Sequence, residues 1–207
     1  MTSTVNRIVR RIPGWAFYVI GAAYAGWLFW QAIQGVWVEP IEVLEHRYGL
    51  KAFQLLLVGL AVTPLRQMTG INLISWRRAI GVTAFFFVLA HFSVWAVLDV
   101  QQISAMWADI IKRPYVTIGM AGFLALIPLA VTSNNLSIRK MGPVKWRKLH
   151  RLAYPAAVLA ALHWVWLAKG FQIEPLVYLA ITVLLLVLRQ KDVLARLRPG
   201  TAAKPSA

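Results

Sequence analysis

The sequence predicts an all-α membrane protein, a polytopic bundle of six transmembrane helices with both termini in the cytoplasm. Hydrophobic residues make up 59% of the 207 residues and charged residues only 14%, whereas a soluble domain usually carries about 25% charged residues. Six apolar runs follow one another along the chain, and most basic residues fall between alternate runs. Cysteine is absent, which excludes disulfides, thiolate metal sites and thiol catalysis.

Each apolar run is long enough, or nearly so, to cross about 30 Å of hydrocarbon, which takes about 20 helical residues. The runs are Trp15–Trp37, Tyr48–Leu65, Ala79–Leu98, Tyr115–Thr132, Leu149–Ala168 and Pro175–Leu188. The first is too long for a cleaved signal peptide, so we expect it to remain as an anchor. The predicted organisation is a cytoplasmic tail over residues 1–14, one membrane domain over 15–190 and a second cytoplasmic tail over 191–207.

The stretch between the third and fourth runs, residues 99–111, is too short to span a bilayer and has an apolar side that carries a tryptophan. We expect it to form a helix lying on the outer membrane surface.

The basic residues predict the orientation of the spans, because the loops of membrane proteins concentrate Lys and Arg on the cytoplasmic side. The segments expected outside carry six acids and only five basic residues, namely Arg47, Lys51, Lys112, Arg113 and Lys169. The segments expected inside carry one acid, Asp192, and 17 of the 22 basic residues: Arg7, Arg10, Arg11, Arg66, Arg77, Arg78, Arg139, Lys140, Lys145, Arg147, Lys148, Arg151, Arg189, Lys191, Arg196, Arg198 and Lys204. The formal charge of +15 therefore reflects topology and contact with membrane lipid, and it does not indicate nucleic-acid binding.

Ionisable side chains inside the hydrocarbon are functional candidates, because each is costly unless it is paired or ligated. With Lys51 counted in the outer segment, the apolar cores contain no Asp, Glu, Lys or Arg, and their notable titratable groups are His91 and His163. Both histidines lie on helices expected to run from inside to outside and should reach a similar depth. Two imidazoles at one level can bind a haem iron from both faces. The alternative is that both are core residues hydrogen-bonded across helices.

His150 should lie roughly 20 Å nearer the cytoplasm than His163, since 13 helical residues separate them. It could hold a second redox centre, or it could belong to the positive cluster of Arg147, Lys148 and Arg151. In an ideal helix the two histidines would point about 140° apart, so they do not share a face. His46 is expected to be an interface residue.

Other chemistry has little support in the sequence. The chain contains no G-x-S-x-G, H-E-x-x-H, P-loop or G-x-G-x-x-G motif, which excludes a hydrolase. A transporter usually shows intramembrane acids or broken helices at mid-depth. A non-redox transporter or scaffold, with histidines as polar contacts between helices, remains the alternative from a different class.

Four stretches carry a resemblance to a known family: AVTPLRQMTG (Ala61–Gly70), RRAIGVTAFFFVLAHFSVWAVLD (Arg77–Asp99), LALIPLAVTSNN (Leu124–Asn135) and WRKLHRLAYPAAVLAALHWVWLAK (Trp146–Lys169). Over about residues 40–190 the chain closely resembles the MsrQ (YedZ) family. These proteins are haem-binding membrane subunits of the bacterial MsrPQ methionine sulfoxide reductase system. They fall within the ferric reductase-like transmembrane superfamily, which also contains the NADPH oxidases.

The resemblance implies a six-helix b-type cytochrome of the inner membrane. It would pass electrons outward to MsrP, a periplasmic molybdopterin enzyme that carries out the reduction of methionine sulfoxide in oxidised proteins. The family's essential histidines match His91, His150 and His163. The oxidases have two histidines on each of the two helices, whereas here Arg77 and Arg78 precede His91. The resemblance thus implies one haem b on His91 and His163, with a second on His150 left open, and contacts of Arg77 and Arg78 with haem propionates or an inner haem.

The electron donor stays open at this point. The chain ends about 19 residues after the sixth run, so we expect no fused flavin and NADPH module. The family is described as drawing on the quinone pool, with FMN also associated and a soluble flavin reductase as a further donor. A stand-alone ferric reductase, or a cytochrome b561-like reductase of quinone or metal ions, is the redox alternative.

Overall fold

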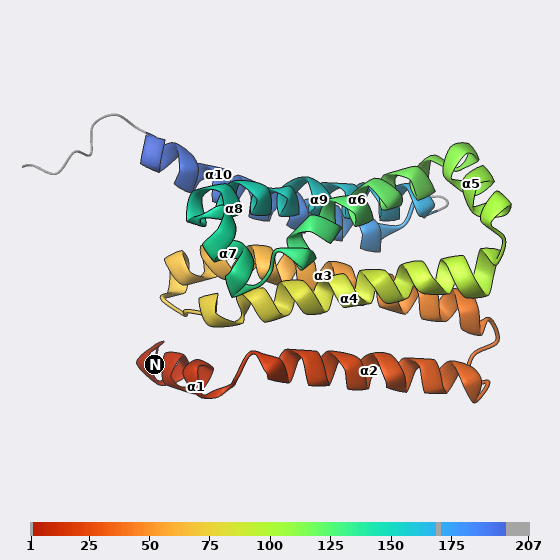
Figure 1. Ribbon diagram of the computed structural model, residues 1–207, viewed down its shortest axis with the longest axis horizontal. Helices are drawn as coiled ribbons and strands as arrows, with labels where there is room; N and C mark the ends of the chain where they lie inside the picture. The colour runs from red at the N-terminus through yellow and green to blue at the C-terminus, as the bar shows by residue number, and fades with distance from the viewer. Residues whose placement is uncertain (1, 169–170, 198–207) are drawn as a thin grey trace, which may run out of the picture.

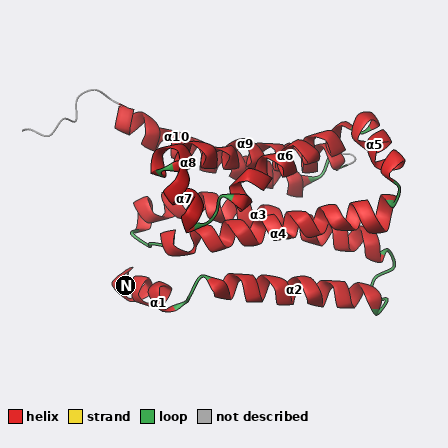
Figure 2. Ribbon diagram, viewed as in Figure 1, coloured by secondary structure: helices red, strands yellow, loops and turns green. Residues whose placement is uncertain are grey.

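The computed structural model describes residues 2–168 and 171–197, and every regular element within them is helical (Figure 2). The longer helices are α2 (Trp15–Ile33), α3 (Pro40–Thr69), α4 (Arg77–Ser93), α6 (Pro114–Val131), α9 (Ala153–Leu167) and α10 (Ile173–Leu197). The shorter elements are α1 (Thr2–Arg11), η1 (Ile74–Trp76), η2 (Val94–Val100), α5 (Ile103–Lys112), α7 (Asn135–Met141), α8 (Pro143–Leu149) and η3 (His150–Leu152).

The long helices lie side by side in three layers (Figure 1). Helix α2 forms one outer layer, α3 and α4 form the middle layer, and α6, α9 and α10 form the other outer layer. Helix α3 packs chiefly against α4, and α6 packs chiefly against α9. Helix α5 caps one end of the bundle, which we call the α5 end, and α1, α7 and α8 gather at the opposite α1 end. The sequence predicts that the α5 end faces outward.

Local sequence explains where several helices begin and end. Proline occupies the first turn of α3, α6 and α8, where its missing N–H costs no helical hydrogen bond. Helix α3 ends at Gly70, whose φ of 75° is a left-handed conformation that glycine adopts without steric cost. Asn134 caps α7, because its side chain accepts a hydrogen bond from the backbone N–H of Ser137.

Helix α3 is the centre of the apolar core. On one side Tyr48 and Ala52 pack with Leu28 of α2 and Phe87 of α4. On the other side Phe53, Leu57 and Leu60 pack with Ala157 and Ala161 of α9. Small residues such as these alanines are common where helices pack in membranes. Large apolar side chains such as Trp15, Ile20 and Trp30 are exposed on α2, which fits a surface that faces lipid.

The structure contains four helices long and apolar enough to cross a membrane within the described ranges: Trp15–Ile33, Pro40–Thr69, Ile74–Val100 and Pro114–Val131. They correspond to the first four predicted spans. Helix α9 has 15 residues, because the chain forms a 3₁₀ turn over His150–Leu152 before it. Side chains of α10 are described only as far as Arg189. Six spans with cytoplasmic termini therefore stay a prediction.

The regions predicted as tails contain helix. Residues 2–11 form α1, and Asn6 ties it to the α3–α4 connection by accepting from the N–H of Asn72 and donating to the carbonyl of Gly70. Helix α10 continues to Leu197, past the expected boundary at residue 190, and residues 198–207 lie outside the described part. The helix expected over residues 99–111 forms as α5, over Ile103–Lys112. The first residues of that stretch instead complete a π-helical turn, η2, at the end of α4.

Candidate functional site

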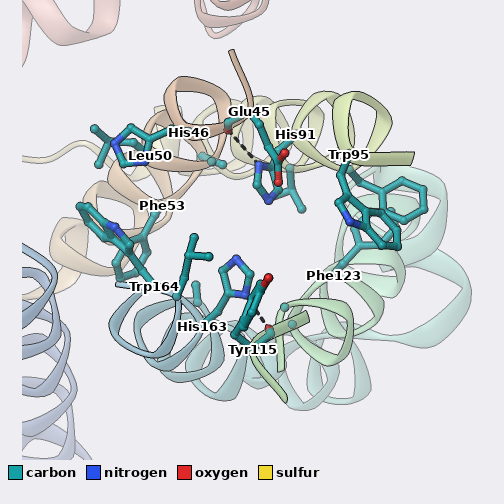
Figure 3. A pocket seen from close by; sticks show the side chains of 18 of the residues that line it. Glu45, His46, Leu50, Phe53, His91, Trp95, Tyr115, Phe123, His163 and Trp164 are labelled. Carbon is teal, nitrogen blue, oxygen red and sulfur yellow. Dashed lines mark hydrogen bonds between the residues drawn. The ribbon is translucent and has the colours of Figure 1, made fainter. Parts of the chain in front are cut away.

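His91 on α4 and His163 on α9 face each other across a cavity between the middle layer and the α6–α9 layer (Figure 3). Their ring centroids are 6.2 Å apart and the ring planes are inclined by 79°. The similar depth predicted for the two histidines is thus confirmed. The sequence places them 72 positions apart, and the antiparallel pairs α3–α4 and α6–α9 bring them together.

Each imidazole is held by a backbone carbonyl of the neighbouring helix. Nδ1–H of His91 donates to the carbonyl of Glu45 on α3, at 2.9 Å, and Nδ1–H of His163 donates to the carbonyl of Tyr115 on α6, at 2.7 Å. A carbonyl can only accept, so both rings carry their proton on Nδ1 and present an unprotonated Nε2. A second-shell carbonyl of this kind commonly orients a metal-binding histidine.

A glycine stands four residues after each of these carbonyls and lets the ring lie against the helix. A Cβ at Gly49 would lie 3.1 Å from Nδ1 of His91, and a Cβ at Gly119 would lie 2.7 Å from Nδ1 of His163. Any larger residue at either position would displace the ring. The two histidines are therefore positioned in the same way, each by a backbone carbonyl and by a glycine four residues further along the neighbouring helix.

The cavity between the histidines has a volume of about 630 Å³, within the range of about 300–1,000 Å³ typical of ligand and cofactor sites. Its walls are largely apolar and aromatic and include Phe53, Phe92, Trp95, Phe123 and Trp164. Phe92 and Phe123 stack with centroids 4.9 Å apart and close the side away from α10. Such walls suit a large, flat, mostly apolar ligand.

Charged groups gather where the cavity reaches the α5 end. Glu42, Glu45 and Asp99 line it there, together with Arg113, the only Lys or Arg among the described lining residues. Arg113 forms an ion pair with Asp109 at 3.2 Å and donates to the Tyr115 hydroxyl at 3.4 Å. The Tyr115 hydroxyl, with Asp109, raises the pKa of the Arg113 guanidinium, so this cation is permanent.

His46, expected to be an interface residue, is exposed and also lines the cavity. Its ring lies edge-on to Trp164, with centroids 5.9 Å apart. It does not face either of the two central imidazoles in Figure 3.

The structure does not bring His150 to this cavity. Its ring stacks on Trp146 at 3.8 Å between centroids, and its Nε2 lies 3.1 Å from the Thr132 hydroxyl. No second histidine lies beside it in the described part of the chain, whose other histidines are all near the α5 end. Its role as a haem ligand stays a prediction.

Arg77 and Arg78 also lie away from the cavity, at the start of α4 near the α1 end. Arg78 donates to the side chain of Asn135 at 2.8 Å. Arg77 is close enough to His150 and Arg189 to interact with both electrostatically. The predicted contact of these arginines with haem could therefore concern only an inner haem, because neither lines the cavity between His91 and His163.

Two basic residues lie within long helices, whereas the sequence analysis counted them with the segments that connect or follow the spans. Arg189, counted with the cytoplasmic tail, is buried, and it donates to the carbonyl of Leu60, the hydroxyl of Thr63 and the hydroxyl of Tyr154. Lys51, counted with the outer segment, lies within α3 and within the range of that candidate span. Both residues lie near the ends of apolar runs. At such positions hydropathy alone does not show whether a basic side chain is buried in the bundle or exposed in a loop.

The fold and this cavity define a multi-pass membrane protein of the ferric reductase class: residues 45–161, more than half of the chain, match the family described as ferric reductase like transmembrane component. The chain is 45% identical to the protein-methionine-sulfoxide reductase heme-binding subunit MsrQ of Agrobacterium fabrum over 174 residues, which is 83% of this chain and 80% of the relative. It is 42% identical to the MsrQ subunits of Brucella ovis and Brucella melitensis biotype 2 over 177 residues, which is 84% of this chain and 80% of each relative. The chain therefore belongs to the MsrQ family, as the sequence predicted. No solved structure shows a significant match.

Proposed function

We propose that this protein is a b-type cytochrome that holds one haem b between His91 and His163 and carries electrons across the membrane. The observation that carries the proposal is the opposed pair of imidazoles, each anchored through Nδ1 and each presenting Nε2 to a shared cavity. When bound there, a haem would supply reversible one-electron chemistry at its iron.

The observed geometry fits the group. Two imidazoles that shared one iron at about 2 Å from each Nε2, with roughly 1 Å from nitrogen to ring centroid, would have centroids up to about 6 Å apart. The observed separation is 6.2 Å. The aromatic walls suit the porphyrin plane, and Arg113 at the α5 end is suited to a propionate.

The identity of the relatives supports the physiological setting that we propose. The relatives are named as heme-binding subunits of a protein-methionine-sulfoxide reductase. We propose that this chain sits in the bacterial inner membrane and delivers electrons to an MsrP-like periplasmic molybdopterin reductase, which carries out the sulfoxide chemistry. The electrons would come from the quinone pool or from a cytoplasmic flavin reductase. Bound FMN and a second haem on His150 stay predictions from the family resemblance.

Absorbance spectra of the purified chain, oxidised and after dithionite, test the haem assignment. We expect a b-type spectrum in the parent and loss of most of it in His91→Ala and in His163→Ala. His150→Ala should keep the full spectrum if one haem is present and lose about half if there are two. Absence of haem from the parent after haem-replete expression, or full haem in both single variants, would refute the proposal.

The delivery of electrons is tested separately. Dithionite-reduced protein, freed of excess reductant, is mixed with an MsrP-like reductase and a peptide containing methionine sulfoxide. We expect reoxidation of the haem that depends on both the reductase and the peptide. A haem that stays reduced with an active reductase present would favour the stand-alone reductase reading.

A further inference from the structure

A second, smaller cavity lies on the flank of α3 between α2 and α10, two helices that contact α3 from opposite outer layers of the bundle (Figure 1). Its volume is about 280 Å³, and its charged lining residues are Arg47 and Lys51 of α3 and Glu174 of α10. Trp27 on α2 and Val177 on α10 are exposed, as expected for a flank that faces lipid. The proposed haem site uses none of the three charged side chains.

The protein leaves these three charges without an ion pair. Among the side chains that the structure describes, none of opposite charge lies within 4.0 Å of Arg47, Lys51 or Glu174. Lys51 donates to the Gln54 side-chain oxygen at 2.8 Å, and the Arg47 guanidinium lies 5.1 Å from the centroid of a Trp37 ring. An ammonium has three N–H donors and a guanidinium has five, so both cations keep donors for an anion from outside the chain. Unpaired charges beside hydrocarbon are costly, which favours such a partner.

The polarity of α3 changes in order along the face that carries this cavity. Side chains at a spacing of three or four residues share one face of a helix, and here they are Arg47, Lys51, Gln54 and Val58. Running inward from the α5 end, the face is first charged, then polar at Gln54 and then apolar at the exposed Val58. The two cations are one turn apart, about 6 Å along the axis, and the interfacial layer of a bilayer is roughly 5–7 Å thick. A phospholipid presents the matching order of a charged headgroup, ester carbonyls and acyl chains.

We infer that this cavity binds the headgroup of phosphatidylethanolamine from the membrane leaflet at the α5 end. The phosphate accepts charge-assisted hydrogen bonds from Arg47 and Lys51, and the ethanolamine ammonium donates to the Glu174 carboxylate. The acyl chains leave along the exposed side chain of Val58, where α3 is apolar. Each of the three unpaired charges thereby gains a partner of opposite sign.

Other ligands with a phosphate match the cavity less well. Phosphatidylglycerol or free phosphate would offer no cation to Glu174, so this carboxylate would stay unpaired beside a second anion. A choline headgroup carries a cation but has no N–H to donate. Free phosphate would also have to leave water for a site bordered by exposed apolar side chains such as Trp27 and Val177. A headgroup with both a phosphate and an N–H-bearing cation therefore fits best.

The experiment uses the haem-loaded chain, purified in detergent and washed free of copurified lipid. Binding of dioctanoyl phosphatidylethanolamine and of dioctanoyl phosphatidylglycerol is titrated by native mass spectrometry, which counts the lipids that remain on each protein. Arg47→Gln, Lys51→Met and Glu174→Gln each remove one charge from the cavity. The matched controls remove exposed charges of the same signs outside both cavities, and they are Lys112→Met and Glu39→Gln.

We expect the parent to bind one phosphatidylethanolamine roughly tenfold or more tightly than phosphatidylglycerol. Arg47→Gln and Lys51→Met should weaken the binding of both lipids by a similar factor, because the phosphate loses a donor. Glu174→Gln should weaken only phosphatidylethanolamine and so remove the preference, while both controls should bind like the parent. The haem content and the dithionite-reduced spectrum, which report an intact fold, should be the same in all proteins. If Lys51→Met fails to fold, the exposed Arg47→Gln decides.

Three outcomes overturn this assignment, and all of them leave the proposed haem site standing. The first is unchanged affinity for phosphatidylethanolamine in haem-loaded Arg47→Gln and Lys51→Met. The second is equal affinity of the parent for the two lipids, which would show that Glu174 recognises no ammonium. The third is release of the bound lipid by inorganic phosphate, which would identify a site for a free anion.

Discussion

At the scale of single residues, each imidazole can occupy its position because the residue that faces it, Gly49 or Gly119, has no Cβ. We expect Gly119→Ala to abolish most haem binding, because its Cβ would lie 2.7 Å from Nδ1 of His163 and would break the hydrogen bond to the Tyr115 carbonyl. Gly49→Ala should have a smaller effect, since its Cβ would lie 3.1 Å from the His91 ring. Haem content per mole of purified protein measures both effects.

Gly81→Ala provides the control for these glycine variants. Gly81 is also in a helix, and a Cβ there would have no neighbour within 4 Å. We expect full haem content and a small gain in stability, of up to about 1 kcal/mol, because alanine favours the helix. Equal haem content in all three variants would show that the glycines do not position the histidines.

The sequence allowed His91 and His163 to be predicted because a titratable side chain stands out in an apolar run. It did not allow their supports to be predicted. Glu45 and Tyr115 contribute backbone carbonyls, which every residue has, and Gly49 and Gly119 are two of 13 glycines. Only the packing of α3 on α4 and of α6 on α9 distinguishes them.

At the scale of helices, Arg189 supplies a hydrogen bond to a backbone carbonyl of α3 that a proline leaves without its helical donor. Pro64 lies inside the helix and has no N–H to give to the carbonyl of Leu60, four residues earlier. Nε–H of Arg189 donates to that carbonyl at 3.0 Å, while the rest of the guanidinium bonds to Thr63 and Tyr154. One side chain of α10 thereby ties together α3 and α9.

This arrangement predicts a coupling between Arg189 and Pro64. We expect Arg189→Met to lower the free energy of unfolding by roughly 2 kcal/mol or more, because it leaves buried acceptors unsatisfied. Pro64→Ala restores a helical N–H to Leu60, so Arg189→Met should cost roughly 1 kcal/mol less in that background. Denaturation of the four proteins in detergent measures the difference. An equal cost in both backgrounds would show that Arg189 does not serve the Leu60 carbonyl.

The helices themselves were predicted more reliably than their ends. Long apolar runs specify that a span exists, and the first four predicted spans have matching helices. The 3₁₀ turn at His150 was not predictable from hydropathy, which does not distinguish it from α-helix. Beside this turn Trp146 donates to the Thr132 carbonyl and stacks on the His150 ring. The amphipathic α1 was counted as a tail, since ten residues with four arginine or asparagine side chains show no apolar run.

At the scale of the whole molecule, six spans require that both α9 and α10 cross the membrane. Helix α9 alone would cover only about 22 Å at 1.5 Å per residue, less than about 30 Å of hydrocarbon. Helix α8, the η3 turn and α9 nevertheless follow one another without a gap over residues 143–167. Extended by this turn, the α9 segment is long enough to reach across beside its partner α6.

The absence of native cysteine makes a direct test of this topology straightforward. Single cysteines are introduced at three exposed positions: Ser104 on α5, Phe171 after α9 and Lys140 on α7. With six spans and the positive loops inside, a membrane-impermeant maleimide should label Ser104→Cys and Phe171→Cys in intact spheroplasts but label Lys140→Cys only after lysis. The unsubstituted chain, which should never react, is the control. If positions 171 and 140 are protected together while position 104 reacts, α9 does not cross, and the prediction of six spans is wrong.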